Sequence, residues 1–374
     1  MRLLGLGTNN LISVDTDAHM RMDIAHLGEL LDELATAQRP VLAVVGVLGT
    51  TEFGTLDPID KIVATRQERE AAGHGFAVHV DAAWGGYLAT LIREPDGGFT
   101  PRESVRAEFR YFPSQDVYDA LVGVSGADSV TIDPHKLGFI PYPAGAFVTR
   151  DRRVAGLLSA SAAYVFDNGG DEPVEVEVRD EDLGRYVLEG SKPGSSAASV
   201  FATHEVLPLD RQGFGQLLSR TIHSSEWLFD ELKELRERLA GVARLEVPIE
   251  PDCNVVCLIV NPEGNTSTSV MNTFMRELVE GMRLRPGRSA RDLEFMGSFT
   301  SIPGDRMLSD DGLRVLTKLG IEQESVPAAG SVFVLRHTLM NPWLLNAASR
   351  PLSRYVEFLE RRILELLEDP SEPR

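Results

Sequence analysis

The spacing of apolar residues alternates between a helical and an extended period along the first part of the chain. Leu27, Leu31 and Leu34 recur at helical intervals, whereas residues 41–47 form an unbroken apolar run. Such a run is typical of a parallel strand that is covered on both faces. The predicted elements, in chain order, are a helix over 22–36, a strand over 41–47, a helix over 59–72 and strands over 76–80, 130–132 and 145–149. This βαβ order predicts a mostly parallel sheet and an α/β fold.

The first helix has no evident N-cap in the sequence. Asp23 falls in its first turn, where a carboxylate favours the helix dipole. Residues 160–196 are rich in Gly, Ser, Asp and Glu, and within them residues 167–173 predict a mobile loop.

The second half of the chain carries a different pattern. A long helical spacing spans about 214–240, and it is followed by strands near 243–248, 253–260 and 331–337 and by helices near 268–281 and 350–368. We therefore predict a large domain over residues 1–212, a connecting helix over 213–242 and a small α+β domain over 243–374.

Composition and charge restrict the partners. The formal net charge of −19 disfavours nucleic acid and anionic membrane surfaces, since both attract basic faces. No leader-like segment and no run of membrane-spanning length is apparent, so we expect a cytoplasmic protein. Cys253 and Cys257 are the two cysteines, and they flank an apolar run that predicts a buried strand. A metal or redox pair is the alternative, but structural thiols fit the spacing better, and we predict no metal site.

Two segments carry candidate chemistry. The strand over 76–80 delivers Asp81 at its C-terminal end, where open α/β sheets bind ligands, and small residues follow it. Residues 128–136 end in Lys136 after a proline turn. Taken singly, Asp81 could be a cap and the lysine segment a polar turn. Together they predict a pyridoxal 5'-phosphate site, in which Lys136 forms a Schiff base and Asp81 keeps the pyridine nitrogen protonated.

These segments resemble the group II pyridoxal-phosphate-dependent amino acid decarboxylases, and within them the bacterial tyrosine decarboxylases. The stretches that carry the resemblance are residues 48–59, 76–86, 128–136, 138–145, 163–166 and 188–195, with a looser match at 334–342. The resemblance implies an aspartate aminotransferase-like fold of type I, a homodimer, and decarboxylation of an L-amino acid. An aromatic, tyrosine-like substrate rests on the resemblance alone, and glutamate or aspartate stay open.

The resemblance also implies roles for further residues around the cofactor. Ala83 packs its methyl group on one face of the ring, and Thr51 lies near the cofactor or the substrate carboxylate. His135 assists the phosphate or the imine, and Ser191 and Ser195 contact the phosphate of the partner subunit. For Thr51 the alternative is strand-end hydrogen bonding, and for His135 it is a structural histidine.

Three further residues are implied on the substrate side. Tyr164 is the expected proton donor to Cα, and Tyr142 lines the substrate side. Either tyrosine could instead be an ordinary half-buried aromatic residue. Arg336 is a candidate for binding the substrate carboxylate, with a surface salt bridge as the alternative.

The chain also departs from this family. Full-length members carry a long N-terminal part that supplies a dimerisation segment, a phosphate-binding turn and a histidine that stacks on the ring. We therefore expect the large domain to be incomplete and the chain to be a fragment, one half of a split enzyme or the product of a mis-started reading frame. Alternatives to the decarboxylase are an inactive subunit that complements a missing N-terminal segment, and an aminotransferase or lyase of the same fold.

The assignment of Tyr164 gives a first prediction. In a complemented or full-length form, Tyr164→Phe should slow amine release about 100-fold, since a positioned general acid contributes about that much. The covalent attachment of the cofactor should persist, because it does not use the phenol. Turnover at the unsubstituted rate would remove Tyr164 from the reaction.

Overall fold

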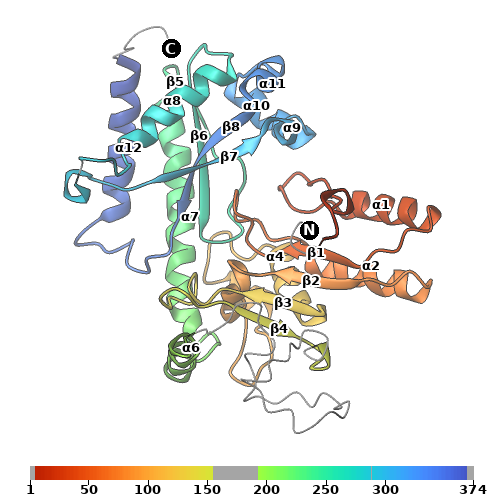
Figure 1. Ribbon diagram of the computed structural model, residues 1–374. Helices are drawn as coiled ribbons and strands as arrows, with labels where there is room; N and C mark the ends of the chain where they lie inside the picture. The colour runs from red at the N-terminus through yellow and green to blue at the C-terminus, as the bar shows by residue number, and fades with distance from the viewer. Residues whose placement is uncertain (1–4, 155–192, 288, 369–374) are drawn as a thin grey trace.

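The computed structural model describes residues 5–154, 193–287 and 289–368, and its strands form two separate four-stranded sheets (Figure 1). The first sheet has the order β1–β2–β3–β4, and the second has the order β5–β6–β8–β7. The strands are β1 (Ala43–Val47), β2 (Ala77–Asp81), β3 (Ser129–Ile132), β4 (Ala146–Thr149), β5 (Ala243–Glu246), β6 (Val255–Pro262), β7 (Ser298–Pro303) and β8 (Ser331–Thr338).

The helices cover both sheets and link them. They are α1 (Ile24–Thr36), α2 (Ile59–Ala71), α3 (Arg102–Arg106), α4 (Gln115–Gly123), α6 (Ser195–Val206), α7 (Phe214–Arg238), α8 (Thr268–Glu280), α9 (Gly304–Met307), α10 (Asp310–Leu319), α11 (Val326–Ala329) and α12 (Pro351–Glu368). A 3-10 helix, η2 (Gly85–Leu91), follows β2. Among the described helices none is both long enough and apolar enough to cross a bilayer.

The first sheet is parallel over β1, β2 and β3 and antiparallel at β4, as the βαβ pattern predicted. In its register Val47 lies beside Asp81, and Asp81 lies beside Thr131. One face is buried against α2 and its neighbours, with Val78 and Val80 fully enclosed. This face holds the first hydrophobic core.

The opposite face of this sheet corrects one expectation. The run over 41–47 was expected to be covered on both faces, but Val45 is 47% exposed and Phe147 on β4 is 56% exposed. In the register, Val45 lies beside His79 on β2, and Phe147 lies opposite Thr131 on β3. The described residues therefore leave this face of the sheet partly open.

The first helix also corrects the sequence analysis. Asp23 is the N-cap of α1 and not a residue of its first turn, because its carboxylate accepts hydrogen bonds from the backbone N–H groups of Ala25 (2.8 Å) and His26 (3.2 Å). The helix buries Leu27 and Leu31 on the first core.

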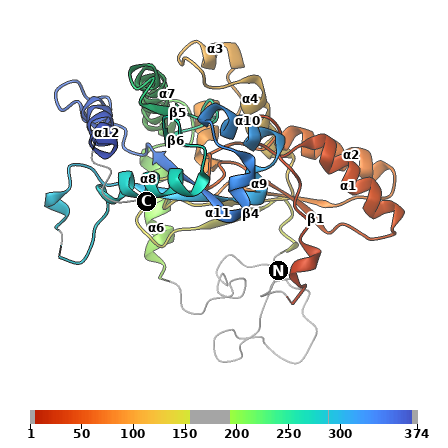
Figure 2. The ribbon, with the colours of Figure 1, turned by 90° about the horizontal axis from the view of Figure 1, so that it is seen from above.

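The long helix α7 belongs to both cores. Its first half places Leu218 and Ile222 in the core of the first sheet, and its second half places Leu228 and Leu232 in the core of the second sheet. Figure 1 shows this helix running past both sheets, and in Figure 2 it is seen nearly along its axis. The proposed domain boundaries at residues 212 and 242 stay a prediction.

A buried ion pair joins the N-terminal segment to the segment that leads into β6. The guanidinium of Arg21 donates to both carboxylate oxygens of Asp252, at 2.8 and 2.5 Å, and the two side chains are almost completely buried. Asp252 also accepts from the backbone N–H of Leu56 at 3.0 Å. Removing one partner of such a pair leaves a buried charge uncompensated, so the contact fixes how these segments meet.

A second buried polar contact lies inside the C-terminal core. His337 on β8 donates from Nδ1 to the carbonyl of Val256 at 2.8 Å, and its Nε2 accepts from the hydroxyl of Tyr355 at 2.7 Å. With the imidazole neutral, both of its nitrogens are satisfied in this arrangement. Burial lowers the pKa of His337 to about 4.

This contact predicts a pH dependence of stability. The unfolded state takes up a proton near the ordinary histidine pKa of about 6.5, whereas the folded state does so only near pH 4. The free energy of unfolding should therefore fall by about 3 kcal/mol as the pH drops from about 6.5 to about 4. Urea titrations of the protein and of His337→Leu measure this. An equal pH dependence in the two proteins would contradict the assignment.

Candidate active site

The C-terminal ends of the three parallel strands meet at one edge of the first sheet. Thr51 follows β1, Asp81 ends β2, and Lys136 follows β3 after a short turn. The register places Asp81 between Val47 and Thr131, so the three loops leave the sheet side by side. This edge is where open α/β sheets bind ligands.

The environment of Asp81 leaves its carboxylate available. Its Oδ1 accepts from the backbone N–H of Ala83 at 3.1 Å. Within the described residues no lysine or arginine forms an ion pair with it. Two residues upstream on the same face, His79 contacts the hydroxyls of Ser129 (2.8 Å) and Thr131 (3.3 Å). The carboxylate therefore accepts a backbone hydrogen bond and has no cationic partner among the described residues.

The residues that follow Asp81 include glycines, and neighbouring backbone leaves no room there for larger side chains. Gly85 donates its N–H to the carbonyl of Leu48 at 2.8 Å, and a Cβ on Gly85 would come within 2.6 Å of that oxygen. At Gly49, whose φ is +90°, a Cβ would meet the ring of Trp84 at 2.7 Å. The loops after β1 and β2 thus lie in direct contact through two glycines.

Lys136 is held by a carboxylate of its own segment. Its Nζ lies 2.9 Å from Oδ2 of Asp133, and the lysine side chain is 32% exposed. His135 lies 3.5 Å from the same oxygen through Nε2, and its Nδ1 lies 2.5 Å from the carbonyl of Ala144. The ring of Tyr142 lies against that of His135, with ring centroids 3.9 Å apart and the ring planes tilted by 32°. The structure therefore brings Lys136, His135 and Tyr142 together around Asp133.

Thr51 and Arg336 meet across the two sheets. The guanidinium of Arg336 donates to the backbone carbonyl of Thr51. A substrate carboxylate or a surface salt bridge was expected as the partner of Arg336, whereas its partner here is a backbone carbonyl. The side chain of Thr51 is exposed at the rim of the strand ends.

The remaining predicted residues are placed only in part. Tyr164 and Ser191 lie outside the described residues. The predicted loop over 167–173 also lies outside them. Ser195 is the first residue of α6 and is exposed. Their roles stay predictions.

Sequence reasoning missed Asp133, which contacts both Lys136 and His135. The signal was present, since Asp133 and Lys136 are three residues apart and a carboxylate at that spacing can reach the amine.

Asp57 lies between β1 and α2 and is bound to the backbone. Its buried carboxylate accepts from the N–H groups of Val47 and Met22, both at 2.8 Å. Burial raises the pKa of Asp57. It does not cap α2, whose N-cap is Pro58.

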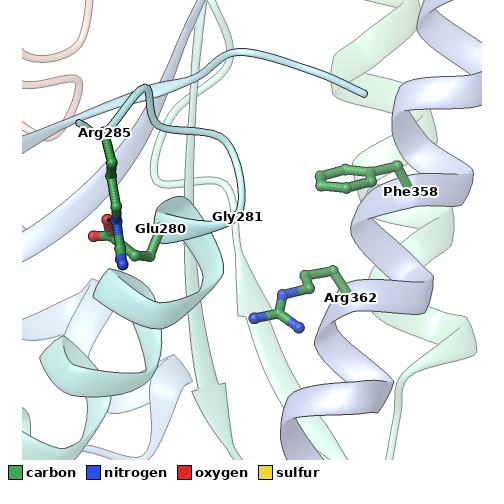
Figure 3. Close-up of a pocket in the computed structure, with 5 residues that line it drawn as sticks. All are labelled: Glu280, Gly281, Arg285, Phe358 and Arg362. Atoms are coloured by element: carbon green, nitrogen blue, oxygen red, sulfur yellow. Dashed lines mark hydrogen bonds and ion pairs between the residues drawn. The ribbon is translucent and has the colours of Figure 1, made fainter. Parts of the chain in front are cut away.

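A cavity elsewhere is not part of this site. It has a volume of about 390 Å³ and lies between the end of α8 and α12, where Figure 3 shows Arg285 and Arg362 at its walls. Its other lining residues are Glu280, Gly281 and Phe358. None of them comes from the first sheet.

The residues at the strand ends fit pyridoxal phosphate. They offer a partly exposed lysine amine, an aspartate without a cationic partner among the described residues, and small residues that let a flat ring approach the backbone. The fold and this edge of the sheet thus define a fold type I protein of the pyridoxal-phosphate-dependent class.

Comparison with known proteins specifies the family. Residues 2–108 match the family described as pyridoxal-dependent decarboxylase conserved domain, and residues 224–367 match the one described as tyrosine decarboxylase, C-terminal. An L-tyrosine decarboxylase of Enterococcus faecalis is 38% identical over 91% of this chain and 55% of its own length, and one of Levilactobacillus brevis is 37% identical with the same coverage. The chain belongs to the pyridoxal-dependent decarboxylase family. It spans about half the length of these curated relatives.

Solved structures support the fold. Mouse CSAD is 20% identical and superposes with a TM-score of 0.65, covering 96% of this chain and 60% of that chain. Oryza sativa TDC, solved with PLP and tryptamine, is 19% identical with a TM-score of 0.62, over 98% of this chain and 60% of that chain. At these identities the likeness establishes fold type I, as the sequence analysis predicted.

The crowding at Gly85 gives a prediction. Gly85→Ala should lower the free energy of unfolding by about 1–3 kcal/mol, because the added Cβ would overlap the carbonyl of Leu48. Gly28→Ala in α1 is the control: its Cβ meets no atom within 4 Å, and the substitution should raise stability by about 0.5–1 kcal/mol. Urea unfolding of both variants measures the difference. Equal changes would show that the β1 and β2 loops are not in tight contact.

Proposed function

We propose that this chain carries the core of a pyridoxal-phosphate-dependent decarboxylase that converts an aromatic, tyrosine-like L-amino acid to its amine and CO2. The observation that carries the proposal is the placement of Thr51, Asp81 and Lys136 at three neighbouring strand ends. The L-tyrosine decarboxylases among its relatives support the substrate class.

The proposal assigns the strand-end residues to the cofactor. Bound pyridoxal phosphate supplies an electron sink for the electron pair left on Cα when CO2 departs. Lys136 would hold the cofactor covalently through Nζ, and before attachment Asp133 pairs with that amine at 2.9 Å. Asp81 would hold the ring nitrogen through its carboxylate, and Ala83 would offer a small surface to the ring.

Further residues act on the substrate and the proton. The phenol of Tyr164 donates the proton to Cα. Tyr142 and His135, whose ring centroids lie 3.9 Å apart, border the substrate side near Lys136. Ser191 and Ser195 reach the phosphate of a partner subunit in a homodimer, and Arg336 acts on the substrate side through its hydrogen bond to the carbonyl of Thr51. A cytoplasmic location is part of the same proposal.

The attachment to Lys136 can be tested without turnover. Incubation with pyridoxal phosphate, borohydride reduction and peptide mapping should place the pyridoxyl group on Lys136, since reduction fixes an imine as a stable amine. Lys136→Ala should lose this labelled peptide. A pyridoxyl group found on another lysine, such as Lys192, would overturn the assignment.

The reaction class is tested by product analysis in the complemented or full-length protein. We expect CO2 release from tyrosine with formation of the amine, and little release from aspartate. Aspartate is the informative competitor, because an aspartate 1-decarboxylase of Aliivibrio fischeri is 30% identical over 62% of this chain. Keto acid without CO2 would identify an aminotransferase, and preference for aspartate would correct the substrate.

A further inference from the structure

The turn between β1 and α2 is closed at its base by its own hydrogen bonds. The N–H groups of Gly49 and Thr50 both donate to the carbonyl of Thr55, at 2.9 and 3.0 Å. The hydroxyls of Thr50 and Thr55 lie 2.8 Å apart, and the N–H of Gly54 donates to the carbonyl of Thr50 at 2.9 Å. These bonds fix the base, but they use none of the carbonyls at the tip, residues 51–54.

Three carbonyls of this tip receive donors from the second sheet and from the segment that leads into its strand β6. The thiol of Cys257 lies 3.0 Å from the carbonyl of Glu52, and the thiol of Cys253 lies 3.1 Å from that of Gly54. The guanidinium of Arg336 donates to the carbonyl of Thr51. Cys257 and Arg336 lie directly opposite each other on β6 and β8, so the sheet register sets the spacing of two of these donors.

The thiols can serve as donors because they stay protonated. Burial raises the pKa of Cys253 to about 12, and burial likewise raises the pKa of Cys257. Both cysteines are free and buried, and at neutral pH each keeps its S–H, which is a weak donor. This fits structural thiols better than a redox pair.

The turn also packs against the start of β6 so closely that Gly54 has no space for a side chain. Gly54 has a φ of +72°, and a Cβ on it would meet the Cβ of Val255 at 2.6 Å and the Sγ of Cys253 at 2.9 Å. A side chain at this position would therefore be strained by its backbone and would push the turn off the strand.

Neighbouring residues of the same segment hold the next loop. The side chain of Asn254 accepts from the indole N–H of Trp84 at 3.1 Å, three residues after Asp81. It also donates to the carbonyl of Leu339 at 3.3 Å. Asn254 is fully buried, and the short segment that leads into β6 thus contacts the loops that follow β1 and β2.

We propose that Cys257 and Arg336 are positioning residues, which hold the tip of the turn so that Thr51 keeps its place at the candidate site. Neither side chain needs to touch substrate or cofactor; they act through the backbone of Glu52 and Thr51. The effect on the reaction rests on the proposed function, whereas the hold on the turn does not.

Amide hydrogen exchange of residues 49–56 tests the hold directly in the protein of residues 1–374. Cys257→Ala and Arg336→Gln should each speed exchange of the Gly49, Thr50 and Gly54 amides about tenfold, since a lost hydrogen bond of about 1.4 kcal/mol corresponds to that factor. Cys257→Ser retains a donor and should restore slow exchange.

Val256→Ala is the matched control. Val256 is the neighbour of Cys257 on β6 and is equally buried, but it faces the second core instead of the turn. It should lower overall stability without a selective change at residues 49–56. Unchanged exchange in Cys257→Ala and Arg336→Gln, or an equal change in Val256→Ala, would overturn the proposal.

The effect of the two substitutions on the reaction is measured separately, in the complemented or full-length protein. The same two variants should raise KM for the amino acid more than they lower kcat, with the serine variant restoring KM. Failure of borohydride labelling at Lys136 would count against the proposed function and leave the exchange result intact. Faster exchange at residues 49–56 with unchanged KM and kcat would overturn the role of the two residues in positioning Thr51.

Discussion

The parallel pairing of β1, β2 and β3 is the constraint on which the candidate site depends. Because their backbones run in the same direction and in fixed register, Val47, Asp81 and Thr131 lie in one row across the sheet. The loops that follow must then emerge at a single edge. A lysine, an aspartate and a threonine that are far apart in sequence become neighbours through backbone hydrogen bonds alone.

Strand pairing alone does not fix the conformation of the loops at the strand ends, and the segment that leads into β6 supplies further contacts to them. Loops at strand ends are free to move unless other elements contact them. Here Asp252 binds Arg21 and the N–H of Leu56, while Cys253 contacts the carbonyl of Gly54 and Asn254 contacts Trp84. The first residues of one buried segment thus contact both strand-end loops, and a substitution there can disturb the site without lying in it.

Much of this arrangement could be predicted from the sequence, for physical reasons that differ between elements. The helix α2, the parallel order of the first sheet and the buried strand β6 follow from local periodicity, which the sequence displays directly. The elements α4, α10 and β7 were not predicted, although the first two begin with the serine caps Ser114 and Ser309. Those caps were a usable signal.

Contacts between distant segments could not be predicted in the same way. Nothing in the local pattern around Arg336 or Cys257 indicates that their partners are carbonyls of residues 51 and 52. The open face beside Val45 likewise depends on what lies over the sheet, and an apolar run alone does not show this. Asp133 is intermediate, since its spacing to Lys136 was visible but its contact with His135 required the folded turn.

The central claim is that the end of β2 presents Asp81 to the ring nitrogen of a cofactor held by Lys136. The nitrogen-15 NMR signal of ring-labelled pyridoxal phosphate bound to the protein tests this contact most directly, because it reports whether that nitrogen is protonated. The account predicts a protonated ring nitrogen in the unsubstituted protein and a shift to the unprotonated signal in Asp81→Asn. The same protonated signal in both proteins would contradict it.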